Sequence, residues 1–248
     1  ANIIGVPLGT AIGQDHGWRI TFWAVAVIAS LAACAVYARV PEPPRNAHAP
    51  GLRRELRTFA QGRLWLAYAT IACFQTAYMG LLSYAAPLLT EVARLPSSAV
   101  PLVLTGFGIG SFIGIHLGAR VADRRPWRTL ATGLGGLTLT MAAIAVLAPV
   151  SGLLTAALML MAGVVSYISS APLNARVFGL AADAPNLASA ANVSAFNVGN
   201  AAGPLLGGWA IHQVGYTGPA LVGVASGLLA LGLMACSRRA DRRLSLIH

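Results

Sequence analysis

The chain has 248 residues, of which 56% are hydrophobic and only 10% are charged, whereas soluble domains carry about one quarter charged residues. Its net charge of +10 comes from 17 basic residues, all of them arginine. A nucleic-acid surface needs basic residues clustered on one folded face with stacking aromatic side chains, and the sequence has no such cluster. The composition therefore excludes a soluble domain and a nucleic-acid-binding protein, and it predicts a protein whose partner is the lipid bilayer.

A short apolar stretch at residues 1–13 comes first in the chain. Seven longer apolar stretches follow, and each is close to the roughly 20 residues that cross a hydrocarbon core as a helix. They are residues 20–37, 64–89, 100–118, 130–148, 153–173, 187–211 and 219–236. The sequence therefore predicts an all-α membrane protein with seven full spans after a truncated one.

The arginines lie in alternate connections between these spans. Fifteen of them lie in residues 39–63, 120–128 and 238–243 or at Arg176, and only Arg19 and Arg94 fall on the other side. Positive residues accumulate on the cytoplasmic side of membrane proteins. This pattern predicts a multi-pass membrane protein whose residues 40–62 and C-terminus lie in the cytoplasm.

Two segments at opposite ends of the chain match each other. Residues 2–9 read Asn-Ile-Ile-Gly-Val-Pro-Leu-Gly, and residues 200–207 read Asn-Ala-Ala-Gly-Pro-Leu-Leu-Gly. A repeat of this kind indicates two related halves. If each half has six spans, the first four spans lie before Ala1, and we expect roughly 130 to 150 residues upstream.

The repeat defines four predicted regions. Residues 1–39 hold the last two transmembrane helices of the N-terminal half, and residues 40–62 form a cytoplasmic linker between the halves. Residues 63–237 form the six-helix C-terminal half, and residues 238–248 form a cytoplasmic tail. The other connections are too short for a soluble catalytic domain. The histidines are scattered, and no catalytic triad or metal-ligand spacing appears, so we expect no enzyme, no metal and no cofactor.

Glycines recur every fourth residue near the end of the chain, at Gly199, Gly203 and Gly207, with Pro204 beside them. Small residues at this spacing let two membrane helices approach closely, and the proline permits a bend. The pattern resembles the antiporter motif of the major facilitator superfamily, and Gly5 and Gly9 belong to the matching first copy. The resemblance implies a 12-helix bundle in which this motif seals a helix interface.

The loop at residues 120–128 is similar to the cytoplasmic signature of that superfamily, Gly-x-Leu-Ala-Asp-Arg-x-Gly-Arg. Asp123 and Arg124 match it directly, whereas Ala119, Pro126 and Trp127 replace its two glycines and an arginine. The resemblance implies a gating loop in which Asp123, Arg124 and Arg128 exchange charge pairs as the inner face opens and closes.

Polar residues within the spans identify a candidate substrate path, because such residues usually face other helices or a water-filled cavity. Their hydroxyl and amide groups suit an uncharged amphipathic or polyhydroxyl molecule. Hydrogen bonding between helices is the alternative role for the asparagines and serines. The candidates are Gln75, Tyr78, Tyr167, Ser170, Asn174, Asn197 and Asn200.

Residues 83–92 and 183–200 narrow the resemblance to bacterial permeases of the drug:proton antiporter group, notably arabinose-efflux and chloramphenicol-resistance types. The resemblance covers nearly the whole chain and implies a secondary transporter that exports a small drug-like or sugar-like molecule in exchange for protons. No carboxylate lies in the middle of a span, so we expect the proton-carrying residue upstream of Ala1. The alternative is a truncated remnant or regulatory membrane protein that does not transport.

Overall fold

The computed structural model describes residues 9, 12–13, 18–39, 59–122, 125–181 and 184–245. Within these residues the chain is helical and contains no strand. The helices are α2 (Trp18–Arg39), α4 (Gly62–Ser83), α5 (Ala85–Pro87), α6 (Val100–Ala122), α7 (Pro126–Leu147), α8 (Gly152–Ile168), α9 (Ser170–Leu180), α10 (Pro185–Val214) and α11 (Gly218–Ser245). The π-helical turn η1 (Leu88–Val92) and the 3₁₀ turns η2 (Ser97–Ala99) and η3 (Gly215–Thr217) complete the described elements.

The described residues contain six apolar helical stretches that are long enough to cross a membrane. The last of these, residues 187–242, contains both α10 and α11, which η3 joins. The stretches therefore match the seven full spans that the sequence predicts, and the all-α membrane fold is confirmed. The predicted first stretch at residues 1–13 and the linker at residues 40–62 fall largely outside the described residues.

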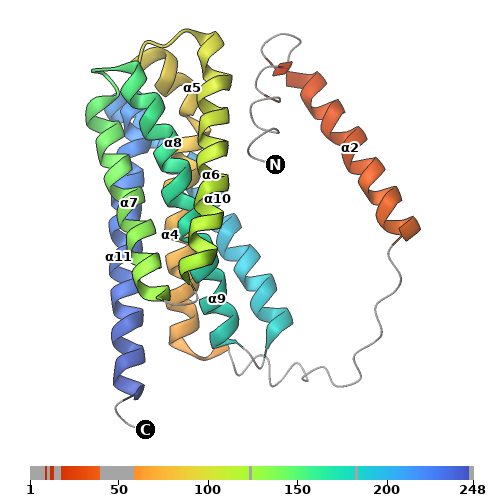
Figure 1. Cartoon of the computed structure of the whole chain (residues 1–248), viewed down its shortest axis with the longest axis vertical. Helices are drawn as coiled ribbons and strands as arrows, with labels where there is room; N and C mark the ends of the chain where they lie inside the picture. Colours follow the sequence, from red (N-terminus) through yellow and green to blue (C-terminus); the bar gives the residue numbers. More distant parts are fainter. Residues whose placement is uncertain are drawn as a thin grey trace.

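Helices α4 to α11 run side by side in one bundle, and α2 lies apart from it (Figure 1). Helix α4 packs against both α10 and α11, while α8 packs against α6 and α7. Leu64, Ile71, Leu134 and Met159 are completely buried between these helices. The centre of the bundle therefore lies along α4, and α2 contributes no buried residue to it.

The outer surface of the bundle is apolar. Large hydrophobic side chains point away from it, including Leu102, Leu139, Leu153 and Leu205, each more than 70% exposed. An apolar outer face of this kind is stable against lipid chains but not against water. The burial pattern and the apolar helices together identify a multi-pass membrane protein.

Three prolines shape the helices around the centre. Pro87 and Pro172 cannot donate a backbone hydrogen bond to Ser83 and Ile168, four residues earlier, and regular helix stops at those residues. Helix α10 instead continues through Pro204. The chain therefore crosses once as α8 and α9, with a break at Ser169 between them.

Two helices are longer than the sequence predicts. Arg176 was expected in a connection, yet it lies within α9, and α11 continues to Ser245 through the region predicted as a tail. Charged residues on these extensions pair with each other, because Arg176 forms an ion pair with Asp241 of α11. The two spans predicted from apolar composition are too short, because composition does not reveal that these charged residues pair within helices.

Candidate functional site

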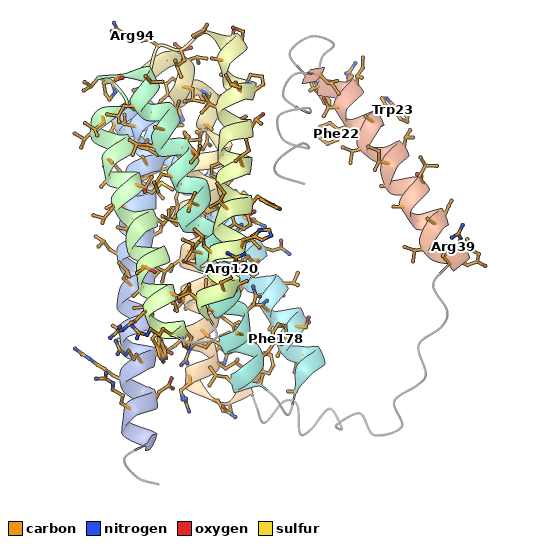
Figure 2. The ribbon with its side chains drawn as sticks, viewed as in Figure 1. Phe22, Trp23, Arg39, Arg94, Arg120 and Phe178 are labelled. Atoms are coloured by element: carbon orange, nitrogen blue, oxygen red, sulfur yellow. The ribbon has the colours of Figure 1, made fainter. Side chains whose placement is uncertain are left out.

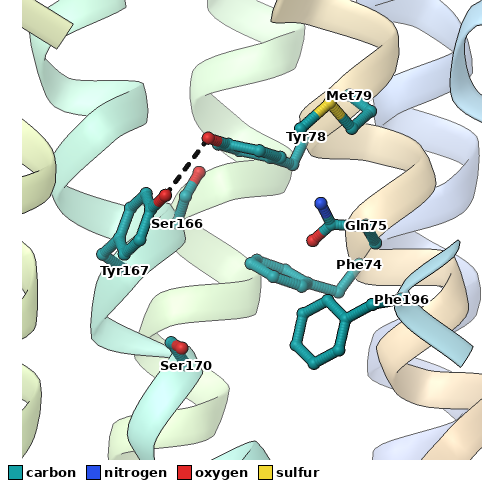
Figure 3. Close-up of a pocket in the computed structure, with 8 residues that line it drawn as sticks. All are labelled: Phe74, Gln75, Tyr78, Met79, Ser166, Tyr167, Ser170 and Phe196. Carbon is teal, nitrogen blue, oxygen red and sulfur yellow. Dashed lines mark hydrogen bonds between the residues drawn. The ribbon is translucent and has the colours of Figure 1, made fainter. Parts of the chain in front are cut away.

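A cavity of about 190 Å³ opens between α4, α8, α9 and α10 (Figure 3). Its lining is aromatic and uncharged, with a few hydroxyl and amide groups. The lining residues are Phe74, Gln75, Tyr78, Met79, Ser166, Tyr167, Ser170 and Phe196. A concave, mostly apolar space with a few convergent polar groups is typical of a small-molecule site.

The cavity lies near the middle of the helices that form it. Its α4 residues fall at 74–79 within Gly62–Ser83, and Phe196 falls within Pro185–Val214. The break between α8 and α9 brings Ser166, Tyr167 and Ser170 to the same space. Membrane transporters place their substrate sites near the bilayer midplane, often where a helix is interrupted.

Two tyrosines meet across the cavity. The hydroxyl of Tyr78 lies 3.3 Å from that of Tyr167, and their rings are nearly perpendicular with centroids 6.0 Å apart. The Tyr78 ring also stacks on Phe74 and packs against Phe107, with centroid distances of 6.4 and 5.9 Å. These contacts connect α4 to α6 and α8 through one aromatic side chain.

A row of amides leads away from the cavity toward α10. Gln75 Nε2 donates to Asn200 Oδ1 at 2.7 Å, and Asn200 Nδ2 donates to Asn197 Oδ1 at 3.3 Å. Gln75 is buried, whereas Asn197 is exposed. The row therefore reaches from the cavity lining to the surface of the bundle.

Asn174 occupies a different place from the other candidates. Its side-chain oxygen accepts a hydrogen bond from Asn192 Nδ2 at 2.8 Å, and its Nδ2 donates to the Ser170 carbonyl at 2.9 Å. This pair ties α9 to α10. Among the predicted path residues, Gln75, Tyr78, Tyr167 and Ser170 line the cavity, while Asn174, Asn197 and Asn200 do not.

The sequence reasoning missed several residues of the site, including Phe74, Met79, Ser166 and Phe196. Helical spacing carries a signal for Phe74, which lies four residues before Tyr78 in α4, but not for Ser166, because the break at Ser169 separates it from Ser170. Residues four apart share a helix face. Phe196 belongs to the α10 face that also presents Asn200, again four residues away.

The predicted sealing glycines of α10 all contact α4 or the turn that follows it. A Cβ on Gly199 would lie 2.5 Å from Gln75 Cβ, and one on Gly203 would lie 2.7 Å from the Gly80 nitrogen. A Cβ on Gly207 would lie 2.9 Å from the Tyr84 ring. The Tyr84 hydroxyl donates to the Pro204 carbonyl at 2.9 Å, so α4 and α10 approach nearly backbone to backbone.

The first copy of the motif is described only in part. Gly5 lies outside the described residues. The Gly9 carbonyl accepts a hydrogen bond of 3.3 Å from Thr21 Oγ1 of α2, and a Cβ on Gly9 would contact Thr21 at 3.4 Å.

A second glycine face, which the sequence analysis did not single out, packs α6 against α8. A Cβ on Gly110 or on Gly114 would lie 2.2 Å from the carbonyl oxygen of Leu160 or of Val164. Gly118 continues the four-residue spacing and meets Ile168. One glycine face therefore packs α10 against α4, and the other packs α6 against α8.

Two residues of the predicted gating loop, Asp123 and Arg124, lie outside the described residues. Arg128 is exposed in the first turn of α7. The structure shows a different charge cluster, in which Arg63 of α4 and Arg176 of α9 both pair with Asp241 of α11.

The Arg176 guanidinium makes further contacts within this cluster. It lies 2.9 Å from Asp241 Oδ2, donates to Ser237 Oγ at 2.6 Å, and sits 4.4 Å from the centroid of the Trp127 ring. These contacts join α7, α9 and α11. Arg94 lies at the opposite end of the bundle from the C-terminal end of α11 (Figure 2), where Arg238, Arg239 and Arg242 lie.

Comparison with known proteins identifies relatives along nearly the whole chain. It is 39% identical over 235 residues to the chloramphenicol resistance protein of Streptomyces lividans, which covers 92% of this chain and 58% of that protein. It is 32% identical over 240 residues to the inner membrane transport protein YdhP of Escherichia coli strain K12, covering 96% and 61%. A probable sugar efflux transporter of Mannheimia succiniciproducens is 27% identical, covering 93% and 58%.

The chain spans about three fifths of the length of these relatives. A family model described as Major Facilitator Superfamily matches residues 1–195. The match agrees with the membrane helices and the glycine-packed interface of α4 and α10. The chain thus belongs to the Major Facilitator Superfamily.

Proposed function

We propose that the complete transporter exports an uncharged, amphipathic small molecule through the cavity between α4, α8 and α10. The observation that carries this proposal is the cavity itself, which lies at mid-helix and has an aromatic lining with no charged side chain. The described residues that line it offer no opposite charge to compensate a cation or anion for its lost hydration. A neutral molecule with an aromatic ring and a few polar groups meets no such cost.

Chloramphenicol is our leading model substrate. It is a neutral aromatic molecule with hydroxyl, amide and nitro groups, and the chloramphenicol resistance protein is 39% identical to this chain. Phe74, Tyr78, Tyr167 and Phe196 supply ring surfaces, and aromatic pairs add stabilisation beyond the area they bury.

A sugar is the second candidate. The amide row of Gln75, Asn200 and Asn197 favours it, because amides both donate and accept hydrogen bonds with hydroxyl groups. The relatives named as probable sugar efflux transporters are 27% to 31% identical to this chain. The four aromatic rings of the cavity weigh against a highly hydroxylated molecule, so we rank it second.

We further propose proton antiport by alternating access, in which one six-helix half rocks against the other. Among the described acidic residues, Glu91 lies in η1 at one end of the bundle and Asp241 near the end of α11. Neither lies near the cavity, so we expect the titrating carboxylate in the other half of the transporter. Asp123, Arg124 and Arg128 are proposed to act at the cytoplasmic gate.

The arginine distribution supports an orientation in a bacterial inner membrane with the C-terminus in the cytoplasm. Arg238, Arg239 and Arg242 lie on the last turns of α11, and Arg94 lies at the other end of the bundle. Positive residues are retained on the cytoplasmic side. We therefore expect that a reporter protein that is active only in the cytoplasm will be active when it is fused after His248.

Export tests the proposed function directly. Cells that lack their own efflux pumps and express the full-length transporter should accumulate less labelled chloramphenicol than cells with an empty vector. Labelled arabinose serves as the matched sugar. Selective reduction of arabinose would assign the sugar role, and unchanged levels of both would favour a protein that does not transport.

A further inference from the structure

The hydroxyl of Ser166 differs from nearly all other buried hydroxyls in the described helices. It is 1% exposed and has no hydrogen-bond partner among the residues that the structure describes. The buried threonines and Ser111 each donate to the carbonyl four residues earlier, which satisfies them within their own helix. These donors are Thr70, Thr76, Ser111, Thr129, Thr138, Thr140 and Thr155.

Ser169 is the other buried serine without a partner, but it faces a different helix. Its Oγ would lie 2.1 Å from a Cβ placed on Gly133 of α7, so it fills the space above that glycine. Ser169 does not line the cavity, whereas Ser166 does. The two serines therefore share their chemistry and burial but not their surroundings.

Ser166 lies beside the tyrosine pair. Figure 3 shows its hydroxyl on the same side of the cavity as the Tyr78–Tyr167 hydrogen bond. At 3.3 Å that bond is longer than the 2.7–2.8 Å typical of two hydroxyls. Ser166 itself lines the cavity, so its hydroxyl lies next to the space that a ligand would occupy.

We propose that Ser166 is a binding residue that donates a hydrogen bond to an oxygen atom of a neutral aromatic substrate. The oxygen belongs to a carbonyl, nitro or hydroxyl group, and the substrate ring lies against the aromatic lining of Phe74 and Phe196. This inference rests on the proposed function, because it names the chemistry that the same cavity recognises. A buried donor without a protein partner costs free energy in the empty protein, and a ligand that accepts its hydrogen bond removes that cost.

This arrangement makes opposite predictions for stability and for affinity. Ser166→Ala removes the unsatisfied hydroxyl, so the ligand-free protein should melt at the same or a higher temperature. The same variant loses a hydrogen bond to the ligand, and its Kd should rise about three- to tenfold. A residue that only packs would change both properties in the same direction.

The experiment is equilibrium binding of radiolabelled chloramphenicol to the purified full-length transporter, together with its ligand-free melting temperature. Ser169→Ala is the matched control, because it removes the same group from a buried site outside the cavity. We expect its Kd to stay within about twofold of the wild type. Ser166→Cys keeps a weak donor of similar shape, and its Kd should fall between the Kd of the wild type and that of Ser166→Ala.

The outcomes separate this inference from the proposed function. Unchanged affinity in both Ser166 variants, with saturable binding by the wild type, would overturn the inference and leave the proposed function standing. Equal weakening in Ser166→Ala and Ser169→Ala would overturn it as well, since the effect would then be one of packing. Absence of saturable chloramphenicol binding by the wild type would overturn the inference and the leading substrate together.

Discussion

The hydroxyls of Tyr78 and Tyr167 lie 3.3 Å apart and join α4 to α8 across the cavity. The two rings make this contact nearly at right angles, with centroids 6.0 Å apart. A substrate on the proposed path would lie beside this contact between two helices. This relationship makes the tyrosine pair a direct place to test the substrate path.

Tyr167→Phe should reduce chloramphenicol export while leaving the fold intact. The ring and its edge contact with Tyr78 are kept, and the lost hydroxyl contact is expected to cost about 0.5–1.5 kcal/mol of stability. The measurement is export by cells, normalised to the amount of protein in the membrane. Tyr216→Phe, in η3 at the end of the bundle, is the control, and equal export by both variants would remove Tyr167 from the path.

Gln75→Ala should change substrate export more strongly than Asn197→Ala. Gln75 is buried and holds Asn200 at 2.7 Å, so its loss leaves a partly buried amide without its partner, at a cost of about 1–3 kcal/mol. Asn197 is exposed at the end of the row. Transport and membrane insertion are measured in parallel. Normal insertion with unchanged export in both variants would reassign the amide row to helix packing.

Gly203→Leu should disrupt the interface between α4 and α10 and abolish transport. Even a Cβ at this position would lie 2.7 Å from the Gly80 nitrogen and 2.8 Å from the Thr76 carbonyl, so the helices have to separate. Gly232→Ala in α11 is the control, because a Cβ there meets nothing within 4 Å. The melting temperature in detergent reports the disruption of the interface, and export by cells reports the loss of transport. Normal transport by Gly203→Leu would refute the sealing role.

Asp241→Asn should destabilise the end of the bundle where α11 terminates. The substitution leaves Arg63 and Arg176 without their shared carboxylate, and we expect a loss of about 1–3 kcal/mol because a hydrogen bond to a charged group is broken. Glu91→Gln is the control, since Glu91 forms no ion pair with the described residues. A melting temperature equal to that of the wild type would show that the cluster contributes no stability.

Much of the fold follows from local sequence. Apolar runs of membrane length locate the helices, and the spacing of Gly199, Gly203 and Gly207 predicts the face that packs on α4. The ends of α9 and α11 could not be predicted this way, because both helices continue through charged residues. Arg176 and Asp241, which pair there, lie 65 residues apart in the sequence. Pairing between helices leaves no local periodicity.

The candidate site could be predicted only in part, because contacts between helices leave no local pattern in the sequence. Gln75 and Tyr78 stand out as polar groups within an apolar helix, and the structure places both at the cavity. Asn174 stands out equally, but it forms a hydrogen bond with Asn192. A polar side chain in a membrane helix can bond either to a ligand or to a neighbouring helix, and the sequence does not distinguish the two. Phe74 and Phe196 carry no polar signal, so only the arrangement of the helices reveals them.

The most direct test of the central claim is proton movement in proteoliposomes that contain the purified full-length transporter. A pH-sensitive dye inside the vesicles reports protons that move when chloramphenicol is added. Our account predicts a saturable, substrate-dependent proton flux that is reduced in Tyr167→Phe and unchanged in Gly232→Ala. A flux equal to that of protein-free vesicles, with the transporter folded and inserted, would contradict it.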